Sequence, residues 1–344
     1  MIMKKISRIF TLIAIASFLL IVYILTDAHR SRAALIPTQT ITDKELLAEL
    51  SPTNGLIYHF EDPAITTQYK DLIPEELKQG SEFKLEAFLE WFTKNYYAPV
   101  FKVENYARLS PEYPDLLIEQ YKKKAEKGSC YNDAILFSFL AQVNGFEVRQ
   151  VYFINKDGYG NDGHTMVEVW LNRLQQWVFV DIRNSALFYK NDEPYSALML
   201  RDEILSLDSV SFYKTVSIVQ FDGYNIAKQD LYSFFRRNCT DFAVSAFSNP
   251  QTKVANSYFY GLFHSISKKE NKFLEKTSRF LRSLFDKSRV NYLLVDEYSG
   301  NKQYTVWYYA FNTSAFFLLI YFIWGLSKIF FFKRSKLKRS QTPS

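Results

Sequence analysis

Two long apolar segments bracket the chain, and they limit how everything between them can fold. The first covers residues 9–25 and the second covers residues 306–332. A helix of about 17 to 25 apolar residues is long enough to cross the hydrocarbon core of a bilayer. We therefore predict two transmembrane helices, with residues 33–304 lying between them on one side of the membrane.

The basic residues near these segments predict an orientation. Three Lys or Arg residues fall in 1–8 and five fall in 333–344. Cytoplasmic flanks of membrane helices are enriched in Lys and Arg, so both ends are predicted to be cytoplasmic and the middle periplasmic or extracellular, at the inner cell membrane. Arg30 and Arg32 on the opposite flank weaken this signal for the N-terminal end.

The N-terminal segment also has a second interpretation. A charged start followed by an apolar centre is typical of a cleaved signal peptide. The apolar run is long for that purpose, and Thr26–Arg30 is a poor small-residue cleavage site. We therefore favour an uncleaved membrane anchor.

The net charge of +6 belongs to the membrane flanks rather than to the middle of the chain. Residues 33–304 hold 31 basic and 35 acidic side chains, a net charge near −4. A nucleic-acid partner normally requires a basic surface. We therefore expect no nucleic acid among the partners.

The middle of the chain divides into three parts. Residues 33–82 contain four prolines and are predicted to be an irregular approach from the membrane. Residues 83–190 form the predicted catalytic unit, and residues 191–304 are predicted to be a mostly helical extension. Within that extension, residues 273–285 have an amphipathic pattern, which suits either a helix resting on the bilayer or one packed on the domain.

Cys130 lies at the predicted start of a buried helix. Residues 131–141 are apolar on nearly every side, which is typical of a helix in a protein core. Gly128 and Ser129 supply a turn and an N-cap in front of it. A thiol in the first helical turn is favoured as thiolate by the free amide groups and the helix dipole.

His164 and Asp181 follow Cys130 in segments that read as strands. Residues 148–154 form one predicted strand, and two further strands are joined by a turn near Asn172–Arg173. A turn centred there would place His164 directly opposite Asp181, and a longer turn would place them diagonally but still within reach. A thiol, an imidazole and a carboxylate in this arrangement predict a nucleophile, its general base and the group that orients the base.

These segments resemble the core of the transglutaminase-like superfamily, a papain-related group of cysteine enzymes. The residues that carry the resemblance are Gly128 and Cys130, then Gly145, Arg149 and Val151, then His164 with Glu168 and Val169, and finally Trp177, Val178 and Asp181. The resemblance implies an α+β fold in which a buried nucleophile helix packs on an antiparallel sheet. It also implies Cys130, His164 and Asp181 as the catalytic residues.

Two positions depart from the family pattern. Thr165 follows His164 where an aromatic residue is common, and Ile182 follows Asp181 where proline is common. Neither change removes a catalytic atom. Both concern the substrate range, because these neighbours line the cleft in the family.

The resemblance implies a membrane-anchored cysteine protease or amidase that forms a thioester acyl-enzyme. Its expected partner is an envelope protein, a peptide or an amide-bearing glycan close to the membrane, and partner membrane proteins are possible. Transfer of the acyl group to an amine stays open as an alternative reaction. A non-catalytic scaffold is the other alternative, and a disulfide between Cys130 and Cys239 would favour it.

No motif in the sequence predicts a cofactor or a metal site. There is no Cys/His cluster for zinc and no phosphate-binding loop with its lysine. The loop 155–163 is acidic and rich in glycine, but it lacks the order of ligands in an EF-hand. We interpret it as a solvated loop that could gate the cleft.

Overall fold

The fold was analysed in a computed structural model of the chain, which divides into two compact units. One unit comprises residues 1–37 and 302–344, and the other comprises residues 38–301. The structure describes residues 2–26, 38–42, 63–78, 82–96, 114–122, 130–154, 163–190, 192–206, 235–237, 239–247, 289–294, 297 and 303–340. Residues 155–162 of the predicted loop 155–163, and the whole of the amphipathic segment 273–285, lie outside these residues.

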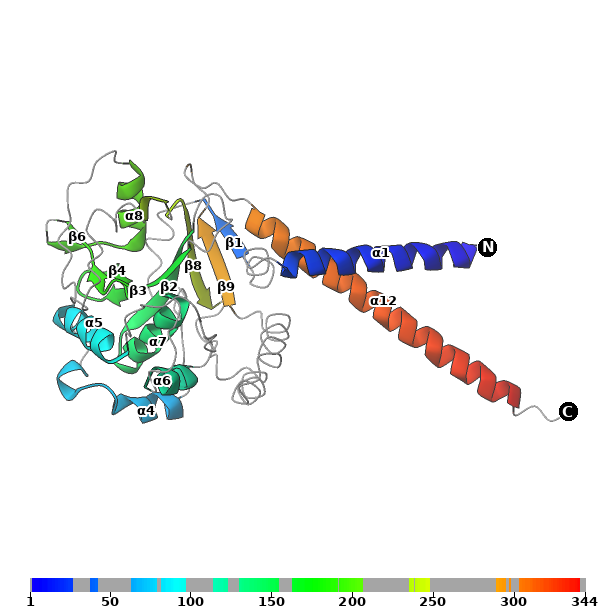
Figure 1. Cartoon of the computed structure of the whole chain (residues 1–344), viewed down its shortest axis with the longest axis horizontal. Coiled ribbons are helices and arrows are strands. Elements are labelled where there is room, and N and C mark those ends of the chain that lie inside the picture. Colours follow the sequence, from blue (N-terminus) through cyan, green and yellow to red (C-terminus); the bar gives the residue numbers. More distant parts are fainter. Residues whose placement is uncertain are drawn as a thin grey trace. The chain divides into compact units, whose positions relative to one another are not determined.

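The first unit is a pair of long helices, α1 (Ile2–Leu25) and α12 (Gln303–Ser340). Both contain a stretch long and apolar enough to cross a membrane, Ser7–Ile24 and Val306–Lys328. The helices lie side by side with the two chain ends at the same end of the pair (Figure 1). The predicted apolar segments are therefore helical along their whole length.

Aromatic contacts set the antiparallel direction of this pair. The Phe10 ring stacks on Trp324 with 5.9 Å between centroids, and Tyr23 meets Trp307 at 6.1 Å. The partner's number falls as the position along α1 rises, so the helices run in opposite directions.

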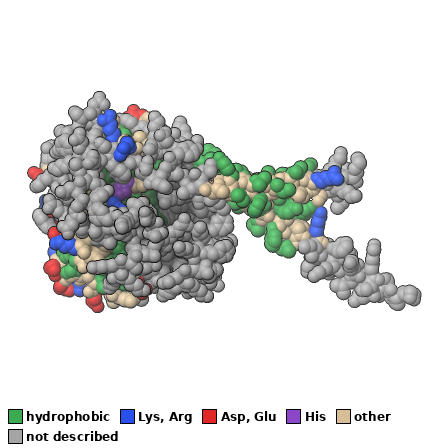
Figure 2. Space-filling model, viewed as in Figure 1, with side chains coloured by type: hydrophobic (Ala, Val, Ile, Leu, Met, Phe, Trp, Pro, Cys, Tyr) green, Lys and Arg blue, Asp and Glu red, His purple; other side chains and the backbone are tan. Residues whose placement is uncertain are grey.

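The interface between these helices is narrow, and most of their surface is apolar and exposed. Ala14, Ser17 and Ser314 are buried, as expected where small residues let two helices approach closely. Hydrophobic side chains cover most of the rest of the pair (Figure 2). An exposed apolar surface of this extent is unusual for a soluble protein and suits a lipid environment.

The second unit is built on a mixed sheet whose described strands run in the order β1-β9-β8-β2-β3-β4-β5. Their bounds are β1 Thr38–Ile41, β2 Glu147–Ile154, β3 His164–Leu171, β4 Gln176–Asp181, β5 Ala186–Leu187, β8 Asp241–Phe247 and β9 Arg289–Leu294. Neighbouring strands pair antiparallel except β1 and β9, which pair parallel. A small hairpin of β6 (Tyr189–Lys190) and β7 (Glu193–Pro194) follows β5.

Helices cover both faces of this sheet (Figure 1). One face packs on α5 (Glu82–Tyr96), α6 (Pro114–Lys122) and α7 (Cys130–Val143), with α4 (Pro63–Lys70) and the short helix η2 (Glu75–Leu77) beside them. The other face packs on α8 (Ala197–Ser206). Alternate residues of β2, β3, β4 and β5 supply the two cores, as the period of a strand requires.

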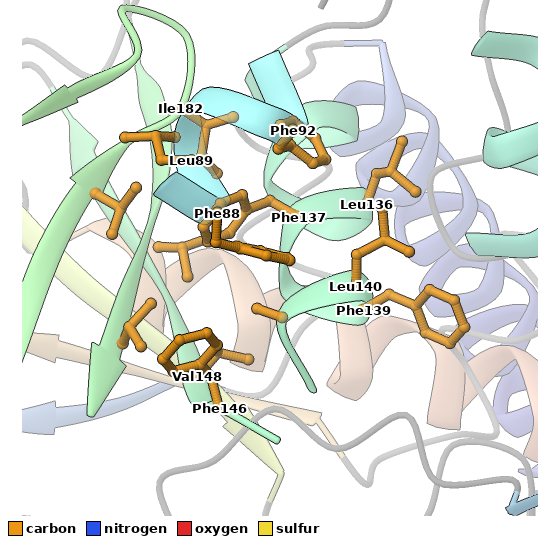
Figure 3. Close-up of a cluster of buried hydrophobic side chains, with 14 of the residues drawn as sticks. Phe88, Leu89, Phe92, Leu136, Phe137, Phe139, Leu140, Phe146, Val148 and Ile182 are labelled. Carbon is orange, nitrogen blue, oxygen red and sulfur yellow. The ribbon is translucent and has the colours of Figure 1, made fainter. Parts of the chain in front are cut away.

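The core around α7 is rich in aromatic residues. Phe137 of α7 meets both Phe88 and Phe92 of α5, with ring centroids 5.4 and 5.2 Å apart (Figure 3). Both contacts are edge-to-face, the arrangement that aromatic rings prefer. The helix is buried nearly all round, as predicted from its apolar sequence.

The end of α7 is fixed by a glycine cap. Gly145 has φ +90°, a conformation that favours glycine. Its N–H donates to Gln142, and the next N–H, that of Phe146, donates to Ala141. This is a Schellman motif. It turns the chain directly from α7 into β2.

The segments that flank the predicted catalytic unit contribute to its sheet, which differs from the sequence-based expectation. Residues 33–82 were expected to be irregular, yet they supply β1, α4 and η2. The described part of 191–304 includes α8 but also strands β8 and β9, where a helical extension was expected. The reason is long-range pairing: β8 pairs with β2, about 90 residues earlier in the chain, and local sequence does not encode that partner.

Candidate active site

Cys130 is the first residue of α7, so its sulfur lies at the positive end of a buried helix. The residue is partly exposed, whereas the helix behind it is buried. The His164 side chain and the backbone of Thr165 both interact with the thiol. Cys130 is therefore partly open to solvent as a residue, while His164 and Thr165 hold its thiol.

His164 begins β3 and lies diagonally across from Asp181, the last residue of β4. The strands pair Leu171 with Gln176, which leaves a four-residue turn between them. This is the longer of the two predicted turns, and it places the two side chains diagonally. The Nε2 atom of His164 lies 3.0 Å from Oδ1 of Asp181.

Asp181 is completely buried and held by the residues that follow it. The backbone N–H of Asn184 donates to Oδ1 at 3.2 Å, and its side-chain Nδ2 donates to Oδ2 at 2.6 Å. With the bond to His164, both carboxylate oxygens are engaged. A carboxylate held in this way fixes the orientation of the imidazole.

The electrostatics of the three groups favour an ion pair between Cys130 and His164. Burial alone would lower the pKa of His164, but the charge and hydrogen bond of Asp181, together with Cys130, raise it to about 10. Burial would raise the pKa of Cys130, yet the hydrogen bond and charge of His164 hold it below its usual range. Burial opposes ionisation of Asp181 too, but His164 and Asn184 lower its pKa.

These directions favour the thiolate of Cys130 and the imidazolium of His164. Because Asp181 engages Nε2, the other ring nitrogen, Nδ1, is left for the thiolate. A thiolate is the nucleophilic form of cysteine, and an imidazolium can return its proton to a leaving group. Within the described part of the chain, no group of three or more His, Cys, Asp or Glu side chains is placed to hold a metal ion.

A second buried carboxylate, Asp133, lies close to these groups. It stands one turn after Cys130 on α7 and accepts a hydrogen bond from the hydroxyl of Tyr121 on α6. Its other oxygen lies 3.2 Å from Nη1 of Arg183, two residues after Asp181. Burial raises the pKa of Asp133, while Arg183 and Tyr121 act to lower it.

Asp133, Arg183 and Asn184 were not identified from the sequence. The signal for Asp133 was a charged residue within an otherwise apolar helix, because a buried charge requires partners. Arg183 and Asn184 carried no comparable signal, since their roles depend on which side chains the fold brings near them.

Two further positions of the family pattern, Arg149 and Glu168, form a buried ion pair on the sheet face that packs on α8. Nε of Arg149 donates to Oε2 of Glu168 at 2.6 Å, and the guanidinium lies 4.4 Å from the centre of the Trp177 ring. The second oxygen of Glu168 accepts the backbone N–H of Ala197, the first residue of α8, at 2.7 Å. These residues therefore join β2, β3, β4 and α8 rather than contacting Cys130.

The second cysteine lies in a different environment. Cys239 is completely buried, and both cysteines are free thiols rather than a disulfide pair. Burial raises the pKa of Cys239 to about 12. The disulfide that would favour a scaffold is thus absent from the structure.

Comparison with known proteins agrees with the resemblance found in the sequence. Residues 76–182 match the sequence model of the transglutaminase-like superfamily. No curated protein and no solved structure matches the chain. The matched segment contains helix α7 and strands β2, β3 and β4, which carry Cys130, His164 and Asp181, and it ends one residue after Asp181. The chain therefore carries a transglutaminase-like domain, as its sequence predicted.

Proposed function

We propose that this protein is a membrane-anchored cysteine hydrolase that cleaves an amide bond through a thioester acyl-enzyme. The observation that carries the proposal is the contact series from Cys130 through His164 to Asp181, with the thiol partly exposed and both partners buried. A nucleophile that is reachable from outside and a base that is held from behind form the arrangement that acyl transfer requires.

In the proposed reaction, the Cys130 thiolate attacks the carbonyl carbon of the substrate. The resulting oxyanion would be met by the backbone N–H of Cys130 at the head of α7, where the first N–H groups of a helix have no partner within the helix. His164 gives its proton to the leaving amine as the C–N bond breaks, which leaves a thioester. His164 then takes a proton from water, and the resulting hydroxide attacks the thioester carbonyl. The C–S bond breaks, which releases the acid and restores the Cys130 thiolate.

The helix pair supports a location at the membrane. An antiparallel pair of two spans places both chain ends on one side of the bilayer, in agreement with the basic residues at both ends. The domain would then face the periplasm or the cell exterior. Its substrate would be an envelope protein, a peptide or an amide-bearing glycan within reach of the membrane.

The proposal can be tested by trapping the acyl-enzyme on the full-length protein in detergent. A library of short peptides is added, the reaction is stopped with acid, and the mass of the peptide carrying Cys130 is measured. We expect an acyl adduct that is lost in Cys130→Ala and disappears with time as water resolves it. A peptide library that yields no adduct and no new amino termini would instead favour the scaffold.

The same experiment separates hydrolysis from acyl transfer. A primary amine such as methylamine is added with the peptides, and the products are analysed for the amide of that amine. We expect free acid to remain the main product. An amide product that dominates at low amine concentration would assign the protein to the transamidases.

A further inference from the structure

The turn that follows Asp181 makes contacts in two directions, and these lead to an inference that rests on the proposed function. Asn184 in this turn donates twice to Asp181, once from the backbone and once from the side chain. Substitution of Asn184 by alanine would remove the side-chain bond to Oδ2, while Oδ1 would keep its bonds to His164 and to the backbone N–H of residue 184.

Arg183, the residue before Asn184, joins the same turn to the nucleophile helix. Its Nη1 lies 3.2 Å from Oδ2 of Asp133, which stands three residues after Cys130 on α7. The Arg183 side chain is 22% exposed and that of Asp133 is 4% exposed, so the ion pair is largely screened from water. An ion pair of this kind holds its two elements together more firmly than a surface pair does.

The turn is also fixed at its far end. The N–H of Ser185 donates to the carbonyl of Ile182 at 3.1 Å, and its hydroxyl lies 2.9 Å from that of Thr93 on α5. Since Thr93 donates its own proton to Leu89, the Ser185 hydroxyl is the donor in this pair. Ser185 has φ +47°, a conformation that costs energy in residues other than glycine and that clusters at functional sites.

We propose that Asn184 is a positioning residue that acts through Asp181, and that Arg183 anchors the turn carrying it to the nucleophile helix. The two residues together link the carboxylate that orients the imidazole with the helix that carries the thiol. The charged and titratable groups around this link are Cys130 and Asp133 on α7, Tyr121 on α6, His164 on β3, Asp181 on β4 and Arg183 in the turn.

The link has a measurable consequence for the thiol. A carboxylate that loses a hydrogen-bond donor is held less firmly in place, so its negative charge is less well aligned with the imidazole and stabilises the imidazolium less well. A His164 side chain with a lower pKa is less often charged and therefore stabilises the Cys130 thiolate less well. The midpoint of Cys130 alkylation with pH should therefore rise when Asn184 is removed, although Asn184 was not found to contact the sulfur.

The experiment measures this midpoint with iodoacetamide on the full-length protein in detergent, in a Cys239→Ala background so that every label reports Cys130. We expect Asn184→Ala to raise the midpoint by about half a unit to one unit, which slows labelling about three- to tenfold below the midpoint. Asn95→Ala is the matched control, because the Asn95 amide lies on the exposed side of α5 and donates to the backbone carbonyl of Trp91. The control should leave the midpoint unchanged.

The anchoring role of Arg183 is tested by a double-mutant cycle. Arg183→Gln should raise the midpoint less than Asn184→Ala does, and Arg183→Lys should restore most of the change. Because both residues act through one turn, the double variant should shift the midpoint by less than the sum of the single shifts. Strictly additive shifts of the midpoint would contradict the proposal that the two residues act through one turn.

The outcomes separate this inference from the proposed function. A wild-type midpoint that is not lowered would overturn the thiolate, and with it the proposed function. A lowered wild-type midpoint with folded Asn184→Ala equal to Asn95→Ala would overturn only the positioning role, leaving Asn184 a structural residue. If Asn184→Ala does not fold, Asn184→Leu decides, since it keeps a side chain of similar size, removes the same donor and should raise the midpoint about as far.

Discussion

The two cysteines of this protein occupy opposite extremes of environment within one domain. Cys130 begins a buried helix and faces an imidazole, and its pKa is held below the usual range. Cys239 lies just before β8 among buried hydrophobic side chains, and burial raises its pKa to about 12. The same functional group is thus prepared for ionisation at one position and protected from it at the other.

The comparison shows which structural feature matters for reactivity. Both thiols face desolvation, which opposes the thiolate in each case. Among the described residues, only Cys130 has an imidazole beside it whose positive charge outweighs that cost, and that imidazole is in turn supported by Asp181. A positive charge, Arg201, is also near Cys239, but its Nε donates to the carbonyl of Cys239 rather than to the sulfur.

The largest expected effect is the difference in labelling between the two thiols of the folded protein. A thiol of pKa near 12 has about a thousandth of the thiolate of one whose pKa lies at or below 9, so iodoacetamide at neutral pH should label Cys130 at least about a thousandfold faster. Mass spectrometry should show no early label in Cys130→Ala and normal label in Cys239→Ala. Equal labelling rates of the two variants would contradict a difference in reactivity between Cys130 and Cys239.

Removal of the imidazole should bring Cys130 closer to Cys239. His164→Ala takes away the charge and hydrogen bond that lower the thiol pKa, while desolvation remains. Labelling of Cys130 at mildly acidic pH should fall at least about tenfold, which corresponds to one unit of pKa. Labelling in urea, where both proteins are unfolded, serves as the control and should be the same for the two.

Substitution of the orienting carboxylate should have an intermediate effect, which depends on pH. The pKa of His164 is raised from 6.5 to about 10, so the stability that its charge contributes is complete below pH 6.5 and is lost as the pH rises towards 10. Asp181→Asn removes the opposite charge, which should lower that pKa by about one to three units. The loss of this stability should therefore be complete at a lower pH in the variant.

This shift can be followed by thermal unfolding of both full-length proteins in detergent across neutral to alkaline pH. The wild-type advantage over Asp181→Asn should be largest near neutral pH and should shrink at alkaline pH. A difference that stays constant with pH would mean that the imidazole is neutral in the folded protein.

The smallest expected effect concerns Cys239 itself. Cys239→Ala removes one buried sulfur and should lower the free energy of unfolding by about 1 to 2 kcal/mol, the range for a small cavity in a packed core. The alkylation rate of Cys130 should not change. A slower rate would show that the two regions are coupled, and the contrast between them would need a different cause.

The parts of the site that sequence alone predicted are those whose signals are local. Cys130 was placed at the head of a helix because residues 131–141 are apolar all round, and α7 begins there. His164 and Asp181 were placed at the open end of a hairpin, one on each strand, because the alternating pattern of residues predicted both strands. Only the turn length stayed open, because either length kept the two side chains within reach.

The parts that could not be predicted depend on contacts between distant segments. Strand β8 pairs with β2, about 90 residues earlier in the chain, and its alternating apolar residues do not indicate which strand it pairs with. Arg183 meets Asp133 from 50 residues away, so neither residue alone indicates the ion pair. The pairing of the two long apolar helices is likewise set by contacts such as Phe10 with Trp324, which no local pattern encodes.

The most direct test of a thiolate–imidazolium pair is the alkylation rate of Cys130 as a function of pH. The measurement uses full-length Cys239→Ala protein in detergent and compares the folded protein with the same protein in urea. An ordinary thiol ionises near pH 8.5, so the unfolded protein should show a midpoint there and the folded protein a clearly lower one. A folded midpoint at or above that of the unfolded protein would contradict an activated Cys130.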